Sequence, residues 1–189
     1  GRFSGSAGFY NTEQLILKEF TDAGLEIRTQ EFRVVVPVTE YAEVLDEKGE
    51  AIPGVTLYPL LPCGLTPTAL PEGGITGNLV VVESADLKYL TGAEPTDSIV
   101  LTYVDSSAGW PSLASVGVRA LIVMEDKAAA ALRSETEARD AWDTLLNMNE
   151  IAFPRFLVRG PLAEQAGKRL TLRCKVTWQE RTVRNLVGV

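Results

Sequence analysis

The segment SIVLTYVDSSAGWPSLASVGVRALIVM, residues 98–124, contains a strand, a short helix and a second strand in one compact run. Two continuous apolar runs, at 99–101 and 120–124, are typical of strands that are covered on both faces. Between them, Pro111 stands where the first turn of a helix tolerates proline, and Gly117 stands where a helix ends. A short crossover of this kind joins parallel strands, so we expect a parallel pair at the centre of the fold.

Further strands are expected on either side of this segment. An apolar run lies within 78–83, and the residues at 156–158 follow Pro154. Between Leu170 and Trp178, apolar and polar residues alternate, which predicts a strand with one apolar face and one solvated face. The sequence therefore predicts a mixed sheet with parallel and antiparallel members.

Two longer helices are predicted outside the central segment. Asn11 and Gln14 have the spacing of a capping box, with Asn11 as the N-cap, so a helix is expected over 12–23. Gly24 is a suitable left-handed stop for it. A second helix is expected to begin at Ser134.

The region between the first helix and the central segment is rich in turn residues. A strand is expected over 26–36, and Pro37 is expected to limit its pairing. Residues 41–46 are predicted to form a separate neighbouring strand, with 47–50 as the tight connection to the residues that follow. The proline and glycine content of 53–77 predicts a long surface loop.

The sequence contains no histidine. A Ser-His-Asp triad, a Cys-His dyad and a His-ligated metal site are therefore excluded within this chain. Cys174 is in the apolar phase of the last predicted strand, which favours a buried free thiol, whereas Cys63 lies in a predicted turn. A disulfide between them stays open, and two cysteines form no zinc cluster.

The net charge of −7 and the isoelectric point near 4.8 argue against nucleic acid or an anionic membrane as the main partner. No apolar stretch approaches the roughly 20 residues that a membrane-spanning helix needs. We therefore expect no nucleic-acid partner and no membrane span in this chain.

Four residues are candidates for contact with a substrate or a partner. Asp105, Glu125 and Asp126 are at predicted strand ends, where ligands often bind in open α/β sheets, although solvated turn carboxylates are the simpler explanation for them. Trp110 precedes the short helix and is either an exposed contact or a core residue. No catalytic or metal-ligating residue is predicted.

The order of elements from about Gly77 to Trp178 resembles that of a protease-associated (PA) domain. The resemblance rests on SIVLTYVDSS, WPSLASVG, VRALIVMED and IAFPRFLVRGPLAEQAGKRLTLRCKVTW. In that family a strand, a helix, a strand with an acidic or polar turn, and a proline-led strand, helix and final strand follow one another. Val118-Arg119-Ala120 departs from the Gly-Ala step that is usual there.

The two ends of the chain resemble the segments that flank such a domain in two-zinc aminopeptidases of the aminopeptidase Y and glutamate carboxypeptidase type. The opening Arg2-Phe3-Ser4-Gly5-Ser6-Ala7-Gly8 is similar to the family's Arg-x-x-Gly-Ser-x-Gly segment. The ending Arg184-Asn185-Leu186-Val187-Gly188-Val189 is similar to its Asn-Val-Ile-Gly stretch. The family's His-x-Asp zinc motif lies downstream of that stretch and has no counterpart here.

The resemblance implies an α/β fold, a PA-like mixed sheet or open barrel with short peripheral helices. It implies an N-terminal helix-strand arm of a peptidase-type domain (1–36), a PA-like domain (37–180) and the strand that re-enters the catalytic domain (181–189). The expected role is a non-catalytic lid or substrate-access module, inactive alone, in an extracytoplasmic zinc aminopeptidase. The expected partners are the parent's catalytic domain and a peptide or protein substrate, and zinc is expected in the parent only.

Two alternatives remain at this stage. The same fold is found in interaction or ectodomain modules, which predicts a parent without zinc ligands and with membrane spans in some cases. A self-contained hydrolase that works through carboxylates needs two acids with separated pKa values in one cleft.

Overall fold

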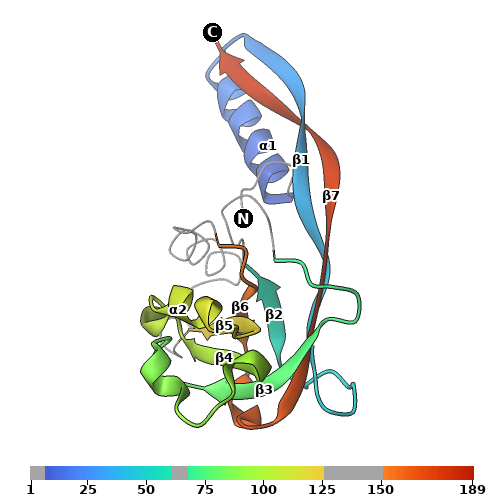
Figure 1. Ribbon diagram of the computed structural model, residues 1–189. Helices are drawn as coiled ribbons and strands as arrows, with labels where there is room; N and C mark the ends of the chain where they lie inside the picture. The colour runs from blue at the N-terminus through green and yellow to red at the C-terminus, as the bar shows by residue number, and fades with distance from the viewer. Residues whose placement is uncertain (1–6, 61–67, 126–150) are drawn as a thin grey trace. The chain divides into compact units, whose positions relative to one another are not determined.

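The computed structural model describes residues 7–60, 68–125 and 151–189 of the chain (Figure 1). The predicted helix at Ser134 lies outside these residues. The chain divides into two compact units. We call Thr39–Val176 the central unit, and Gly1–Val38 together with Thr177–Val189 the terminal unit.

Within the described residues, seven strands form one mixed sheet in the order β1-β7-β3-β4-β5-β6-β2. The predicted α/β class with a mixed sheet is confirmed, and the sheet is open because β1 and β2 end the order without pairing to each other. The strands are β1 (Ile27–Leu45), β2 (Thr56–Pro59), β3 (Ile75–Val81), β4 (Ser98–Tyr103), β5 (Ala120–Met124), β6 (Arg155–Arg159) and β7 (Arg169–Gly188). The helices are α1 (Ala7–Asp22), α2 (Trp110–Ser115) and the 3-10 turns η1 (Leu87–Leu90), η2 (Pro95–Asp97), η3 (Val104–Ser106) and η4 (Leu162–Gln165).

The central unit is built on four parallel strands. β3 pairs with β4, β4 with β5, and β5 with β6, all in parallel, and α2 connects β4 to β5 as the sequence predicts (Figure 1). The outer pairs are antiparallel: β2 lies beside β6, and β7 lies beside β3.

Apolar side chains cover both faces of this sheet. On β4, Val100 packs into one cluster with Trp110 and Leu113 of α2, while Ile99 and Leu101 pack into the opposite cluster with Phe156 and Leu172. β5 alternates in the same way. Each fully buried side chain of this size contributes roughly 1.5–3 kcal/mol through its burial. The continuous apolar runs of the sequence therefore follow from two covered faces.

Two prolines lie within paired strands, contrary to the prediction. Pro37 lies inside β1, which continues to Leu45, so the predicted separate strand at 41–46 is part of the same strand. The predicted loop at 53–77 contains β2, which ends at Pro59, and the start of β3. Both prolines are on strands that end the sheet order, and a strand of that kind has one side on which a missing N–H costs no ladder bond.

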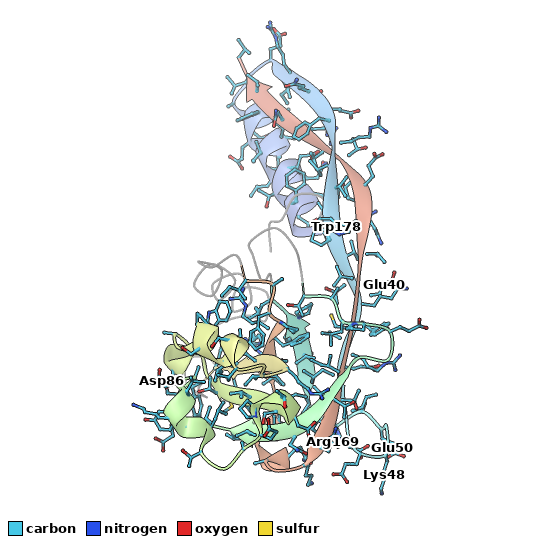
Figure 2. The ribbon with its side chains drawn as sticks, viewed as in Figure 1. Glu40, Lys48, Glu50, Asp86, Arg169 and Trp178 are labelled. Atoms are coloured by element: carbon cyan, nitrogen blue, oxygen red, sulfur yellow. The ribbon has the colours of Figure 1, made fainter. Side chains whose placement is uncertain are left out.

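One carboxylate in the central unit connects three elements. Asp97, at the end of η2, accepts two hydrogen bonds from the Arg169 guanidinium of β7, at 2.7 and 3.1 Å, and one from the Asn78 amide of β3 at 3.0 Å (Figure 2). The paired hydrogen bonds from Arg169 and the charges of Arg169 and Arg119 hold the pKa of Asp97 below its ordinary value, against a smaller opposing effect of desolvation.

The terminal unit consists of α1 with the outer parts of β1 and β7. The helix begins by Ala7, so Asn11 lies inside it and the predicted capping box is wrong. The apolar stripe of the helix starts earlier than expected, at Phe9, which is on the same face as Ile16 and Phe20. The predicted stop at Gly24 is confirmed: its φ is +74°, a value that favours glycine, and it lies two residues after Asp22, the last residue of the helix.

β7 is longer than predicted, and the burial of its apolar side chains changes along its length. Leu170, Leu172 and Cys174 are buried in the central unit. Trp178, in the terminal unit, is 52% exposed although it belongs to the same apolar phase (Figure 2). The alternating pattern predicted the strand correctly, but it did not predict where the covering side chains end.

Candidate functional site

Two of the three predicted strand-end acids have a described backbone, and both are at the carboxyl ends of parallel strands. Glu125 directly follows β5, and the backbone of Asp105 is in η3 after β4. The side chain of Asp105 and all of Asp126 lie outside what the structure describes. Of the three predicted acids, Glu125 is therefore the one whose environment is defined.

Glu125 is a buried carboxylate and not a solvated one. Its side chain is 1% exposed, and its Oε2 accepts a hydrogen bond of 3.2 Å from Nη2 of Arg159. Met124 pairs with Val158, so Glu125, directly after β5, lies beside Arg159, the last residue of β6. The ion pair holds the carboxyl ends of β5 and β6 together. The sequence analysis missed Arg159, and only the strand register identifies it as the partner of Glu125.

Trp110 is a core residue in this structure. Its indole is 3% exposed and lies parallel to the ring of Phe153, with 5.9 Å between the ring centroids. The guanidinium carbon of Arg155 is 4.2 Å from the centroid of the Trp110 ring. Arg155 is itself fully buried, so the cation–π contact forms in a desolvated setting where such contacts are strongest.

Cys174 is a free and buried thiol, as the sequence favours. Its Sγ donates a hydrogen bond of 3.2 Å to the backbone carbonyl of Thr68. Burial raises the pKa of Cys174 to about 11, so the nucleophilic thiolate is scarce at neutral pH. The role of Cys174 is structural packing, and Cys63 lies outside the described residues.

A groove with a volume of about 650 Å³ lies between α1 and the end of β7 in the terminal unit. The sequence analysis did not identify it. Most of its lining is apolar, with a charged pair among the lining residues. It is lined by Phe9, Thr12, Glu13, Ile16 and Phe20 of α1 and by Arg184, Asn185, Leu186 and Val187 of β7.

Glu13 is the unusual member of this lining. Its side chain is 3% exposed and forms an ion pair with Arg184, which is about one third exposed. Its Oε1 accepts the hydrogen bond from Arg184, whereas its Oε2 has no partner. Within 7–38 and 177–189, Glu13 and Val183 are the two residues classed as buried. The terminal unit thus encloses a carboxylate and one valine and has almost no apolar core.

The residues that the structure describes do not form a zinc site. Structural and catalytic zinc sites take three or four ligands from His, Cys, Asp and Glu, and the sequence has no histidine. No cluster of three or more such side chains occurs in the part of the chain that the structure describes. Across those same residues, no helix is both long enough and apolar enough to cross a membrane.

The fold of this chain is similar to part of known zinc aminopeptidases. The zinc aminopeptidase BSAP from Bacillus subtilis matches 97% of this chain with a TM-score of 0.64 at 18% identity, and the match covers 41% of BSAP. A peptidase M28 precursor from Shewanella amazonensis matches 98% of this chain with a TM-score of 0.56 at 14% identity, over 46% of its own length. Neither a family model nor a curated protein matched the sequence. The chain thus spans less than half of these structural relatives.

Proposed function

We propose that this chain is a non-catalytic module of a zinc aminopeptidase-type metallopeptidase whose zinc-binding half lies outside residues 1–189. The observation that carries the proposal is the match to BSAP, which takes in nearly all of this chain but 41% of the enzyme. The absence of histidine from the sequence is consistent with it, because the chemistry then has to reside in the other part of the parent.

Within this proposal the central unit acts as a protease-associated lid or wall beside the active site. It influences which peptides reach the zinc, while the terminal unit belongs to the peptidase-type domain. Trp110 and Glu125 are buried, so they serve this role by holding the end of the sheet in shape. Asp105 and Asp126 are then the remaining candidates for direct contact with a peptide. An extracytoplasmic location is part of the proposal and follows from the family resemblance.

The first test is the zinc content and activity of the complete gene product. We expect bound zinc and release of amino-terminal residues from peptides, both lost on treatment with a chelator and restored by zinc. A complete product that binds no zinc and cleaves no peptide contradicts the proposal. That outcome favours the interaction or ectodomain module instead.

The second test addresses the lid role. In the complete product, a short glycine-serine linker replaces the central unit and joins Val38 to Thr177. We expect continued hydrolysis of a small aminoacyl substrate and a changed ratio of kcat/KM between long and short peptides. Lys48→Ala, at an exposed turn position of the central unit, is the control and leaves the ratio unchanged (Figure 2). An unchanged ratio in the linker variant removes the lid role and leaves the peptidase assignment intact.

A further inference from the structure

We propose that Val81, Glu83 and Tyr103, at the carboxyl ends of β3 and β4, form a contact surface for peptide substrates that carry lysine or arginine. We call these three residues the strand-end surface. The inference rests on the proposed function, because it takes the central unit as the part of a peptidase that influences substrate access. It deepens that function by naming the class of peptide and the residues that favour it.

The first argument is a change in burial along one face of the sheet. On this face, Leu79 of β3 is 1% exposed and Leu101 of β4 is fully buried. Two positions further along, Val81 is 38% exposed and Tyr103 is 47% exposed. Residues two positions apart on a strand share a face, so the covering of this face stops before the strands end. An apolar and an aromatic side chain are therefore accessible at the ends of neighbouring strands.

The second argument is the position of Glu83 relative to Tyr103. β3 and β4 are parallel neighbours with Val81 in register with Leu101, and Glu83 and Tyr103 each lie two residues beyond that pair (Figure 1). Two backbone hydrogen bonds of 2.9 Å, donated by residues 82 and 85 to β4 and η3, hold the chain around Glu83 beside the chain around Tyr103. The carboxylate thus belongs to the same edge of the sheet as the exposed ring.

The third argument is that the charge of Glu83 is available to a ligand. Its side chain is exposed, and none of the described residues forms an ion pair with it. Other acids of the central unit differ, since Asp97, Glu40 and Glu43 each pair with an arginine or a lysine. A carboxylate and an aromatic ring both attract a cation, and the aliphatic stem of a lysine or arginine packs on an apolar side chain such as Val81.

The sequence repeats this arrangement on the neighbouring strands. Asp105 follows Tyr103 by two residues, and Asp126 follows Met124, the last residue of β5, by two residues. Each of β3, β4 and β5 is therefore followed by an acid at the same spacing. The proposal rests on Glu83, since its side chain is described, and the repeated spacing adds negative charge to this end of the chain's parallel strands.

The charge of the whole central unit favours the same class of peptide. Thr39–Val176 contains 19 Asp and Glu against 12 Lys and Arg, whereas the terminal unit contains 6 of each kind. The net charge of −7 therefore belongs entirely to the central unit. A negative field attracts a basic peptide and repels an acidic one. A second copy of this chain carries the same charge, so a basic peptide is the better occupant.

The selectivity of the complete gene product between two matched peptides tests the proposal. Both peptides have the same length and an amino-terminal leucine, and they carry either lysines or glutamates at the following positions. The measured quantity is the basic-to-acidic ratio of kcat/KM. We expect a ratio above one at about 50 mM salt and a smaller ratio at about 500 mM, because salt screens exposed charges.

Variants of the strand-end surface separate a contact from the general field. Glu83→Gln removes the charge and Tyr103→Leu removes the ring, and each should lower the ratio by about 2–5-fold. Glu83→Lys reverses the charge and should lower it further. Glu72→Gln is the matched control, because it makes the same change of charge at an exposed turn before the start of β3. Equal ratios in Glu83→Gln and Glu72→Gln overturn the proposal.

A binding measurement keeps the test independent of catalysis. Fluorescence anisotropy of the labelled basic peptide gives its Kd for the complete product after treatment with a chelator. We expect Glu83→Gln to raise this Kd by about 2–5-fold and Glu72→Gln to leave it unchanged. Circular dichroism verifies the fold of each variant, and three exposed substitutions at two positions keep the test decisive if one of them fails to fold. A Kd that is the same for the wild type and all three variants overturns the proposal.

The strand-end surface and the peptidase activity fail separately. A product without zinc or activity that still binds the basic peptide through Glu83 keeps the surface and removes the proposed function. An active zinc peptidase whose ratio and Kd do not change in Glu83→Gln keeps the function and removes the surface.

Discussion

Replacing Trp110 tests whether this residue is a core element or a surface contact. The indole is 3% exposed and contacts both the ring of Phe153 and the guanidinium of Arg155. Trp110→Ala removes the buried ring and the cation–π contact together. Core substitutions of this size lower the free energy of unfolding by about 3–5 kcal/mol. For a domain of this size that loss lowers Tm by roughly 6–20 °C.

Urea unfolding followed by circular dichroism measures the free energy of unfolding of each variant. Trp110→Phe keeps an aromatic ring with a weaker cation–π contact, so we expect a loss of only about 1–2 kcal/mol. A double-mutant cycle with Arg155→Met isolates the contact between the two side chains, and we expect a coupling of about 2 kcal/mol because the contact is desolvated. If Trp110→Ala costs less than about 1 kcal/mol and weakens peptide binding instead, the core assignment is refuted.

Three further perturbations follow from the central unit. For Asp97, whose pKa is depressed, the stability difference between the wild type and Asp97→Asn should be complete above the ordinary pKa of 3.8 and shrink as the pH falls through the lowered value. Thermal unfolding should therefore show a smaller difference at about pH 2.5 than at about pH 6. In a Cys63→Ser background, Cys174 should react with iodoacetamide at least about 100-fold more slowly than a thiol of pKa 9.0, and rapid labelling of the native protein would contradict its burial. Gly160→Ala should destabilise the protein far more than Gly49→Ala, although both glycines have a positive φ. A Cβ at position 160 would meet a backbone oxygen at 2.0 Å, whereas no atom lies within 4 Å of a Cβ at position 49. Equal Tm values of the two variants would refute this.

The sequence predicted the central sheet well because its signal is local. The apolar runs of β4 and β5, and the proline and glycine around α2, each determine a short element and its order along the chain. Parallel pairing then follows from the helix between the two strands, because a strand-helix-strand crossover returns the chain in the same direction. These features involve neighbouring residues, so a single sequence contains them in full.

One error has a non-local cause and one a local cause. Pro37 has the local signature of a strand end, but its cost depends on whether the strand has a neighbour on both sides, which only the sheet order shows. Asn11 has the spacing of a cap, but Phe9 lies on the same apolar face of α1 as Ile16 and Phe20, so the helix begins before Asn11.

The burial of charged residues could not be predicted from the sequence either. Glu13 and Arg155 look like ordinary surface residues in the sequence, since burial of a charge depends on side chains from distant elements. Arg184 lies 171 positions from Glu13. Neither periodicity nor composition predicts a contact between residues so far apart in the sequence.

The terminal unit is discontinuous in the chain, and this sets an order for folding during synthesis. Its first part, Gly1–Val38, leaves the ribosome before the central unit, but its second part, Thr177–Val189, appears only afterwards. At the usual elongation rates of about 5–20 residues per second, α1 waits on the order of 10 s for the strand that completes its unit. During that interval Phe9, Ile16 and Phe20 have no partner strand to cover them. Chaperones should therefore bind the α1 segment of the nascent chain more readily before Thr177–Val189 is synthesised than afterwards.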